Sequence, residues 1–188
     1  MVKDCPSTQQ TSSKATPSVA ASTVTPKPTP STTGKEPMRQ GRVFALVLGD
    51  VQNTETVVSG ILSICTQNAY VLIDSGSTHL YVSHAFSRKL NRPLETMNYL
   101  LAVSSPIGGP MTCAYMYPAC EIIVGDALLF IDLLPLNIDH FDVILGMDWL
   151  TKYHATIDCV PKQVVFRPPG LLEFVFNGVG LVPPPYLI

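Results

Sequence analysis

Short apolar runs, separated by glycine, proline, asparagine and serine, follow one another from residue 57 onward. The runs "TVVSGILSI" and "NAYVLI" are rich in β-branched residues and have turn-forming flanks, as is typical of β-strands. Residues 99–118 and 120–136 each read as strand, tight turn and strand, and residues 155–166 predict a last short hairpin. The pattern therefore predicts a chain built mostly of β-hairpins.

Two segments have the spacing of short helices. Residues 83–90, "SHAFSRKL", begin with a serine suited to the N-cap and place their apolar side chains near one face. Residues 147–154, "MDWLTKYH", follow the apolar strand "FDVILG" and place Trp149 and Leu150 inward. Many short strands with two brief helices predict a mostly-β fold, either a barrel or a sandwich.

The first 40 residues differ in composition from the rest. Twenty of them are Ser, Thr or Pro, and the first aromatic residue of the chain is Phe44. Such a segment cannot bury enough apolar surface to offset the entropy lost on ordering. We therefore predict a disordered linker at residues 1–40, a folded domain at 54–168 and a C-terminal connector at 169–188.

Charge, apolar run length and cysteine content argue against several classes of function. The formal net charge is −2, without the clustered Lys and Arg that a nucleic-acid surface needs. No apolar run reaches the roughly 18 to 20 residues of a membrane helix. The five cysteines form no Cys-x-x-Cys pair and are odd in number, which argues against a disulfide framework and against a complete zinc site. We expect reduced thiols, no metal and a cytoplasmic protein.

In the stretch "VLIDSGSTHL", residues 71–80, a run of three apolar residues is followed directly by the carboxylate residue Asp74. A buried strand ending at Asp74 would deliver that carboxylate rigidly to a cleft, as a catalytic acid requires. Gly76 permits a tight turn, and Ser75 adds a hydroxyl that donates and accepts hydrogen bonds. The alternative is an ordinary Asp-Ser-Gly turn after a strand, because these residues favour turns.

Peptide-bond hydrolysis by carboxylates needs two of them, because a close pair shares one proton and acts as acid and base together. One member takes a proton from water while the other polarises the scissile carbonyl. The chain contains a single Asp-[Ser/Thr]-Gly, at Asp74, so the second carboxylate has to come from a second chain. A two-fold axis beside this turn would supply it, and dimerisation would then be the activating step.

In the motifs "DSGSTHLYVS" and "FDVILGMDWL", Gly146 follows Asp74 by 72 positions, and a glycine-rich hairpin lies between the motifs. This arrangement resembles the retropepsin-like aspartic proteases of Gypsy-type LTR retrotransposons, and those of plants most closely. The resemblance spans residues 54–168. It implies a mostly-β, retropepsin-like closed acid-protease barrel with one or two short helices, preceded by the disordered N-terminal segment.

The resemblance also assigns roles to residues of the first motif. Asp74 is implied to be the catalytic aspartate, with Ser75 and Gly76 completing the active-site turn. Ser77 and Thr78 occupy the next motif positions and are implied to contact substrate, the first of them close to an aspartate oxygen. Hydrogen bonding within the turn is the alternative for both.

The tip of the 99–118 hairpin, "SPIGGP" at residues 105–110, would form a flap that closes over a peptide; an ordinary surface loop is the alternative. The substrate contacts implied there are Ser105, Ile107, Gly108 and Gly109. Gly146 is implied to pack behind the active-site turn. Asp148 and Trp149 are expected to be helix and core residues rather than catalysts.

The function implied is that of an aspartic endopeptidase acting as a homodimer on polypeptides, its own gag-pol polyprotein included, in the cytoplasm or in virus-like particles. No cofactor is needed, because the nucleophile is water. Cys5 resembles the last ligand of a zinc knuckle whose other three ligands are absent, so no metal is expected. Two alternatives stay open: a catalytically silent module of the same fold that dimerises or binds peptides, and a nucleic-acid-binding remnant.

Overall fold

The computed structural model describes residues 37–43, 57–105 and 109–179, all within the compact unit Lys35–Ile188. Its strands are β1 (Met38–Arg42), β2 (Val58–Ile64), β3 (Gln67–Ile73), β4 (Tyr81–Ser83), β5 (Glu95–Ser104), β6 (Met111–Val124), β7 (Ala127–Leu136), β8 (Val143–Leu145), β9 (Thr156–Asp158), β10 (Gln163–Phe166) and β11 (Phe174–Asn177). Its helices are α1 (His84–Ser87) and α2 (Met147–Lys152).

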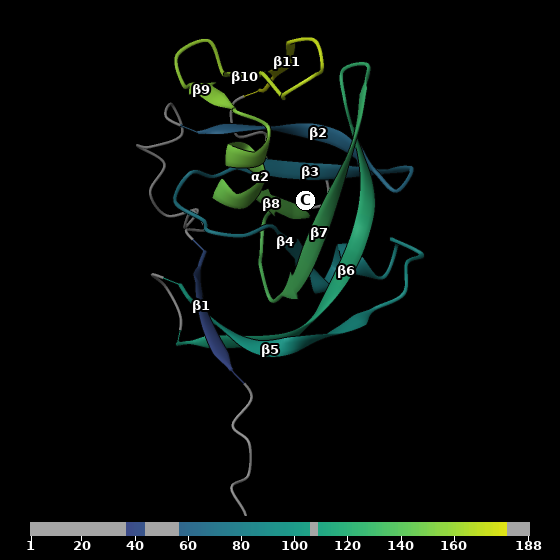
Figure 1. The fold of residues 1–188 in the computed structure, drawn as a ribbon, viewed down its shortest axis with the longest axis vertical. Coiled ribbons are helices and arrows are strands. Elements are labelled where there is room, and N and C mark those ends of the chain that lie inside the picture. Colours follow the sequence, from purple (N-terminus) through teal and green to yellow (C-terminus); the bar gives the residue numbers. More distant parts are fainter. Residues whose placement is uncertain (1–36, 44–56, 106–108, 180–188) are drawn as a thin grey trace, which may run out of the picture. The chain divides into compact units, whose positions relative to one another are not determined.

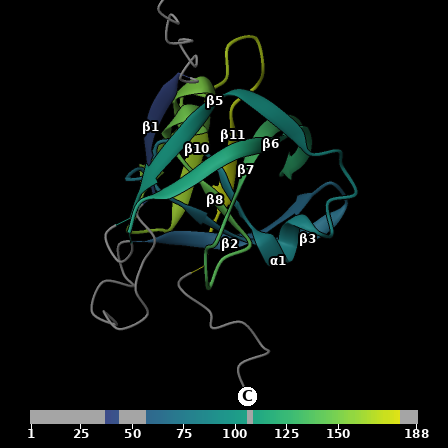
Figure 2. The same ribbon diagram turned by 90° about the horizontal axis from the view of Figure 1, so that it is seen from below.

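Six strands form a closed barrel. They neighbour one another in the order β6, β2, β3, β8, β4 and β7, and β7 pairs back with β6 (Figure 1). Strands β5 and β1 extend the sheet outward from β6, and β9, β10 and β11 form a separate three-stranded sheet. Seen from below, β5 and β6 lie side by side (Figure 2). The predicted mostly-β closed barrel with two short helices is confirmed.

The hairpin of β2 and β3 and its parallel neighbour β8 position the predicted site. Cys65 and Thr66 join β2 to β3 with φ values of 47° and 66°, the left-handed pair that matches strand twist in a two-residue hairpin turn. Strand β8 runs parallel to β3 with Val71 opposite Val143. Parallel strands end at the same edge of a sheet, so the residues that follow β3 and β8 emerge together.

Two apolar clusters hold the fold together. The larger fills the barrel and includes Trp149, whose ring centroid lies 5.0 Å from that of Phe166. The smaller lies under β1 and β5 and includes Val43, Tyr81 and Ile144. Strand β8 contributes to both, because its residues are buried on either face. The site edge is therefore supported by packing on two sides.

Strands β1 and β11 lie outside the predicted domain of residues 54–168, each at an end of a different sheet. Residues 38–40, predicted as part of the linker, belong to β1, which pairs in parallel with β5 from Met38 opposite Leu100. Strand β11, inside the predicted connector 169–188, pairs with β10. Strand β1 gains its partner from a segment far away in sequence, which local composition does not show. Strand β11 pairs with the neighbouring β10, and its link to the barrel is the bridge between Val179 and the distant Ser59.

The two predicted helices form, in shorter versions. Helix α1 begins after Ser83, whose Oγ accepts a hydrogen bond from Phe86 N at 3.1 Å, so the predicted N-cap is confirmed. Helix α2 ends at Lys152 rather than at residue 154. Within the described ranges, no helix has the length and apolarity needed to span a membrane.

Candidate active site

The Asp74 carboxylate lies on a tight turn directly after β3. Its backbone N donates to Leu145 O at 3.0 Å, which fastens the start of the turn to the end of β8. Asp74 Oδ1 accepts a hydrogen bond from Gly76 N at 2.7 Å, and Oδ2 accepts one from Ser77 Oγ at 2.6 Å. Both oxygens are thus held in place, while the residue keeps partial exposure to solvent. Charge-assisted bonds of this kind are short and strong.

Helix α2 starts against the back of this turn. Met147 N donates to Ser77 O at 2.8 Å, and Asp148 N donates to Thr78 O at 3.0 Å. A Cβ on Gly146 would stand 2.2 Å from His79 O and 2.7 Å from Ser77 O, so only glycine fits. The structure brings Gly146 to the place that its motif implies.

The hydroxyls of Ser77 and Thr78 face the protein in this single chain. Ser77 is fully buried, and its hydroxyl contacts Asp74. Thr78 Oγ1 accepts from Arg42 N at 2.8 Å. The alternative interpretation, hydrogen bonding within and around the turn, accounts for both contacts, and a peptide contact by either residue stays a prediction. Ser75 is exposed on the turn.

The remaining predicted substrate contacts belong to the tip of the β5–β6 hairpin. Ser105 directly follows β5 and is half-buried, and Gly109 is exposed two residues before β6. Ile107 and Gly108 lie outside the described residues. The hairpin itself forms as predicted, with Val103 opposite Met111 at its end.

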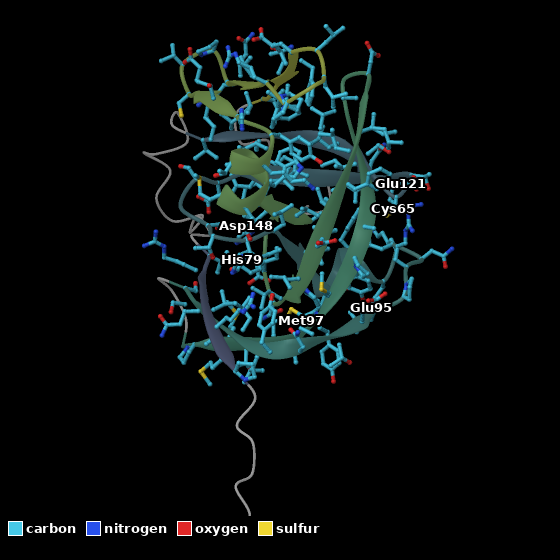
Figure 3. The ribbon with its side chains drawn as sticks, in the orientation of Figure 1. Cys65, His79, Glu95, Met97, Glu121 and Asp148 are labelled. Atoms are coloured by element: carbon cyan, nitrogen blue, oxygen red, sulfur yellow. The ribbon has the colours of Figure 1, made fainter. Side chains whose placement is uncertain are left out.

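Sequence reasoning missed three side chains around the turn. Arg42, from β1, donates from Nε to Gly76 O at 3.2 Å. His79 Nδ1 pairs with the Asp148 carboxylate, which ties the end of the turn to α2; Figure 3 shows the two side chains together. Arg42 stands outside the predicted domain, and His79 and Asp148 are 69 residues apart, so no local pattern marks these contacts.

Tyr81 is the strongly perturbed titratable group near the turn. Burial raises the pKa of its phenol to about 12, so the hydroxyl stays protonated. It donates to Arg42 O at 3.2 Å. A neutral, buried hydrogen-bond donor therefore supports the segment that contacts the turn.

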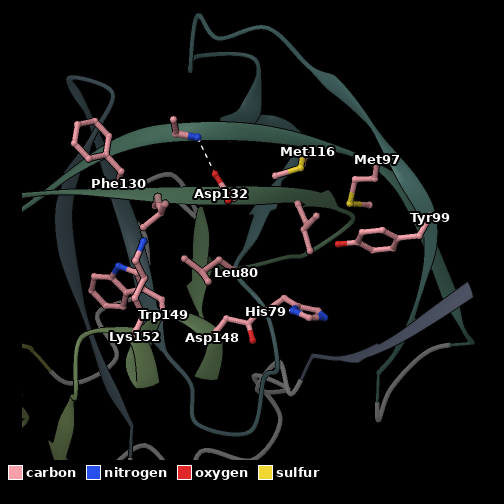
Figure 4. A pocket seen from close by; sticks show the side chains of 13 residues that line it. His79, Leu80, Met97, Tyr99, Met116, Phe130, Asp132, Asp148, Trp149 and Lys152 are labelled. Carbon is pink, nitrogen blue, oxygen red and sulfur yellow. Dashed lines mark hydrogen bonds and ion pairs between the residues drawn. The ribbon is translucent and has the colours of Figure 1, made fainter. Parts of the chain in front are cut away.

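A cavity of about 290 Å³ lies beside the turn and is lined by residues of β5, β6, β7 and α2 (Figure 4). Its lining mixes apolar and ionisable side chains: His79, Leu80, Met97, Tyr99, Met116, Ala119, Phe130, Ile131, Asp132, Leu134, Asp148, Trp149 and Lys152. Asp132 Oδ1 accepts from Ala119 N at 2.8 Å. Asp74 is not part of this lining, so the cavity adjoins the predicted catalytic group without containing it. No three His, Cys, Asp or Glu side chains in the described ranges are grouped so as to hold a metal.

A comparison with curated proteins gives no match. The retroviral protease-like domain of Ddi1 from Leishmania major is 12% identical with a TM-score of 0.48, covering 59% of this chain and 88% of that one. The EIAV protease complexed with the inhibitor HBY-793 is 20% identical with a TM-score of 0.47, covering 56% of this chain and 96% of that one. The model of the retroviral aspartyl protease family matches residues 37–169, which include β1, the Asp74 turn and α2; the chain therefore belongs to that family.

Proposed function

We propose that the protein is an aspartic endopeptidase in which Asp74 from each of two copies forms the catalytic pair. The observation that carries this proposal is the anchoring of the Asp74 carboxylate. It stands at the end of a buried strand, with one oxygen held by Gly76 N and the other by Ser77 Oγ, and it keeps access to solvent. A carboxylate fixed in this way on rigid elements is suited to act on a substrate.

The chemistry needs the second copy, because one carboxylate cannot serve as acid and base at once. Two Asp74 side chains a few ångströms apart would share one proton. The ionised member removes a proton from water, whose oxygen attacks the peptide carbonyl carbon. The protonated member donates to the carbonyl oxygen, and a proton then passes to the amide nitrogen as the carbon–nitrogen bond breaks. Within each chain, Gly76 and Ser77 keep the carboxylate oriented during these transfers.

We further propose the biological setting from the two sequence motifs. "DSGSTHLYVS" and "FDVILGMDWL" resemble the motifs of Gypsy-type retrotransposon proteases. The substrate would then be a polypeptide, first the gag-pol polyprotein of which this chain would be a part, processed in the cytoplasm or in virus-like particles. The partner is a second copy of the chain.

The test compares wild type with Asp74→Asn, which keeps the size of the side chain and removes its charge. Sedimentation measures association, and a mixed peptide pool at mildly acid pH, with and without pepstatin, measures cleavage. We expect both proteins to dimerise and only the wild type to cleave, in a pepstatin-sensitive way. Asp126→Asn, on the exposed β6–β7 turn, is the matched control and should cleave as wild type does.

Three results contradict the proposal. Cleavage by Asp74→Asn would show that another group does the chemistry. A wild type that stays monomeric at high concentration would leave the pair unformed. Dimers that cleave nothing in either protein would favour the silent peptide-binding or dimerisation module.

A further inference from the structure

We propose that Arg42 of β1 is a positioning residue for the Asp74 turn, so that a strand before the motif-bearing region is part of the catalytic machinery. The inference rests on the proposed proteolytic function and adds a residue to it. Arg42 is not expected to touch substrate. Its role is to hold the peptide groups that in turn hold the carboxylate.

The first link is a reciprocal bridge between residues 42 and 78, made by their backbones and by the Thr78 hydroxyl. Arg42 N donates to Thr78 Oγ1 at 2.8 Å, and Thr78 N donates to Arg42 O at 2.9 Å. Thr78 Oγ1 also lies 3.2 Å from Arg42 O. The far end of the turn is therefore fastened to β1, just as its near end is fastened to β8.

The second link is made by the side chain of Arg42. Its Nε donates to Gly76 O at 3.2 Å. The amide on the other side of that peptide bond, Ser77 N, donates to Asp74 O at 3.2 Å, and Gly76 N donates to Asp74 Oδ1 at 2.7 Å. A cation bonded to this carbonyl polarises the peptide group whose N–H, that of Ser77, donates to the backbone oxygen of Asp74, the residue whose carboxylate Gly76 N holds. Loss of the guanidinium would loosen the middle of the turn.

The third link is close packing of β1 on the residues that follow the turn. A Cβ on Gly41 would stand 2.9 Å from His79 Cδ2 and 3.0 Å from Tyr81 Oη, so the strand approaches as closely as glycine allows. Val43, one residue after Arg42, is 1% exposed and donates from N to Ser104 O at 3.0 Å. Strand β1 thus joins the turn to the end of β5, where the predicted flap begins.

The experiment replaces Arg42 with alanine and uses Arg39→Ala as matched control. Arg39 is on the same strand with the same charge, but its guanidinium lies 4.1 Å from the Tyr99 ring on β5, away from the turn. Neither change removes a backbone hydrogen bond of β1, so both variants should fold, which a cooperative urea transition of each would verify. With Arg42→Ala we expect kcat to fall by about 10- to 100-fold, as a small misplacement of a catalytic group does. KM should stay near its wild-type value in both variants, and Arg39→Ala should keep the wild-type kcat.

Amide hydrogen exchange provides the readout that does not depend on activity. Exchange at Ser77 N should speed up by about tenfold in Arg42→Ala, as expected for one lost hydrogen bond, and should not change in Arg39→Ala. Equal kcat values and equal Ser77 exchange in the two variants would overturn the inference. If wild type itself cleaves nothing, the proposed function fails, and the exchange comparison alone decides whether Arg42 positions the turn.

Discussion

Gly146→Ala is expected to destabilise the protein strongly, more than alanine at the other glycines whose Cβ contacts are known and whose φ is not positive. The added Cβ would meet two backbone oxygens, His79 O at 2.2 Å and Ser77 O at 2.7 Å. Backbone atoms cannot rotate aside as a flexible side chain can, so either α2 or the Asp74 turn has to move. A shift that restores normal contact distances stretches the bonds from the first α2 amides to Ser77 O and Thr78 O.

The magnitude follows from these two effects. Overpacking of a tight site costs about 1–3 kcal/mol. Each of the two stretched backbone hydrogen bonds contributes about 0.5–1.5 kcal/mol. We therefore expect the free energy of unfolding to fall by about 2–6 kcal/mol, a large share of the roughly 5–15 kcal/mol typical of a whole domain.

The assay is urea unfolding at one fixed protein concentration, because association would shift the midpoint. Trp149 is the single tryptophan of the chain, sits on α2 and is 2% exposed, so its fluorescence reports on the helix that the substitution pushes. The midpoint should fall by more than about 1 M urea. Gly109→Ala, whose Cβ meets nothing within 4 Å, is the control and should unfold like wild type. If Gly146→Ala also unfolds like wild type, the close approach of α2 to the turn is wrong.

Three further predictions concern buried groups. Ser77→Ala removes the hydroxyl donor to Asp74 Oδ2 and should lower the free energy of unfolding, measured by urea titration, by about 1–2 kcal/mol. Ser75→Ala, on the exposed side of the turn, is the control and should change it little. Equal effects of the two substitutions would contradict the hydrogen bond. Burial raises the pKa of Tyr81 from 10.0 to about 12, so its contribution is fully present below pH 10 and is lost as pH rises toward 12, when the unfolded chain ionises first. Unfolding midpoints measured from pH 8 to 12 should therefore fall more steeply for wild type than for Tyr81→Phe, and parallel curves would refute this. Burial also raises the pKa of Cys120, a fully buried thiol, to about 12. Iodoacetamide at pH 8 should therefore leave Cys120 unmodified until urea unfolds the chain. Labelling of Cys120 in the native protein, detected by peptide mass spectrometry, would show that the barrel opens there.

The elements around Asp74 could be predicted because their signals are local. An apolar run into Asp-Ser-Gly marks β3 and its turn, and Gly146 after an apolar run marks the junction of β8 with α2. Hairpins with short turns also leave local traces, such as Gly125 with φ 59° between β6 and β7. Strand composition and turn chemistry thus predicted a mostly-β fold without knowledge of which strands pair, and the resemblance of the two motifs implied the closed barrel.

The missed parts depend on contacts between segments far apart in the chain. Residues 38–42 have a single buried position, Gly41, so their sequence carries no alternation that predicts a strand. Their pairing depends on β5, with Arg42 opposite Ser104. The Ser, Thr and Pro content of residues 1–37 extended the predicted linker over them. A contact such as Arg42 Nε to Gly76 O becomes visible only when the tertiary arrangement is known.

Strand β11 determines where the domain can be trimmed. The ring of Phe176 fills the space beside Gly60, with a carbon 2.7 Å from where a Cβ would stand, and Val179 N donates to Ser59 O at 2.7 Å. A cut between residues 168 and 173 would separate this strand from its domain and leave an apolar wall of the barrel open to water. C-terminal ends chosen for recombinant expression are therefore expected to lie beyond residue 179.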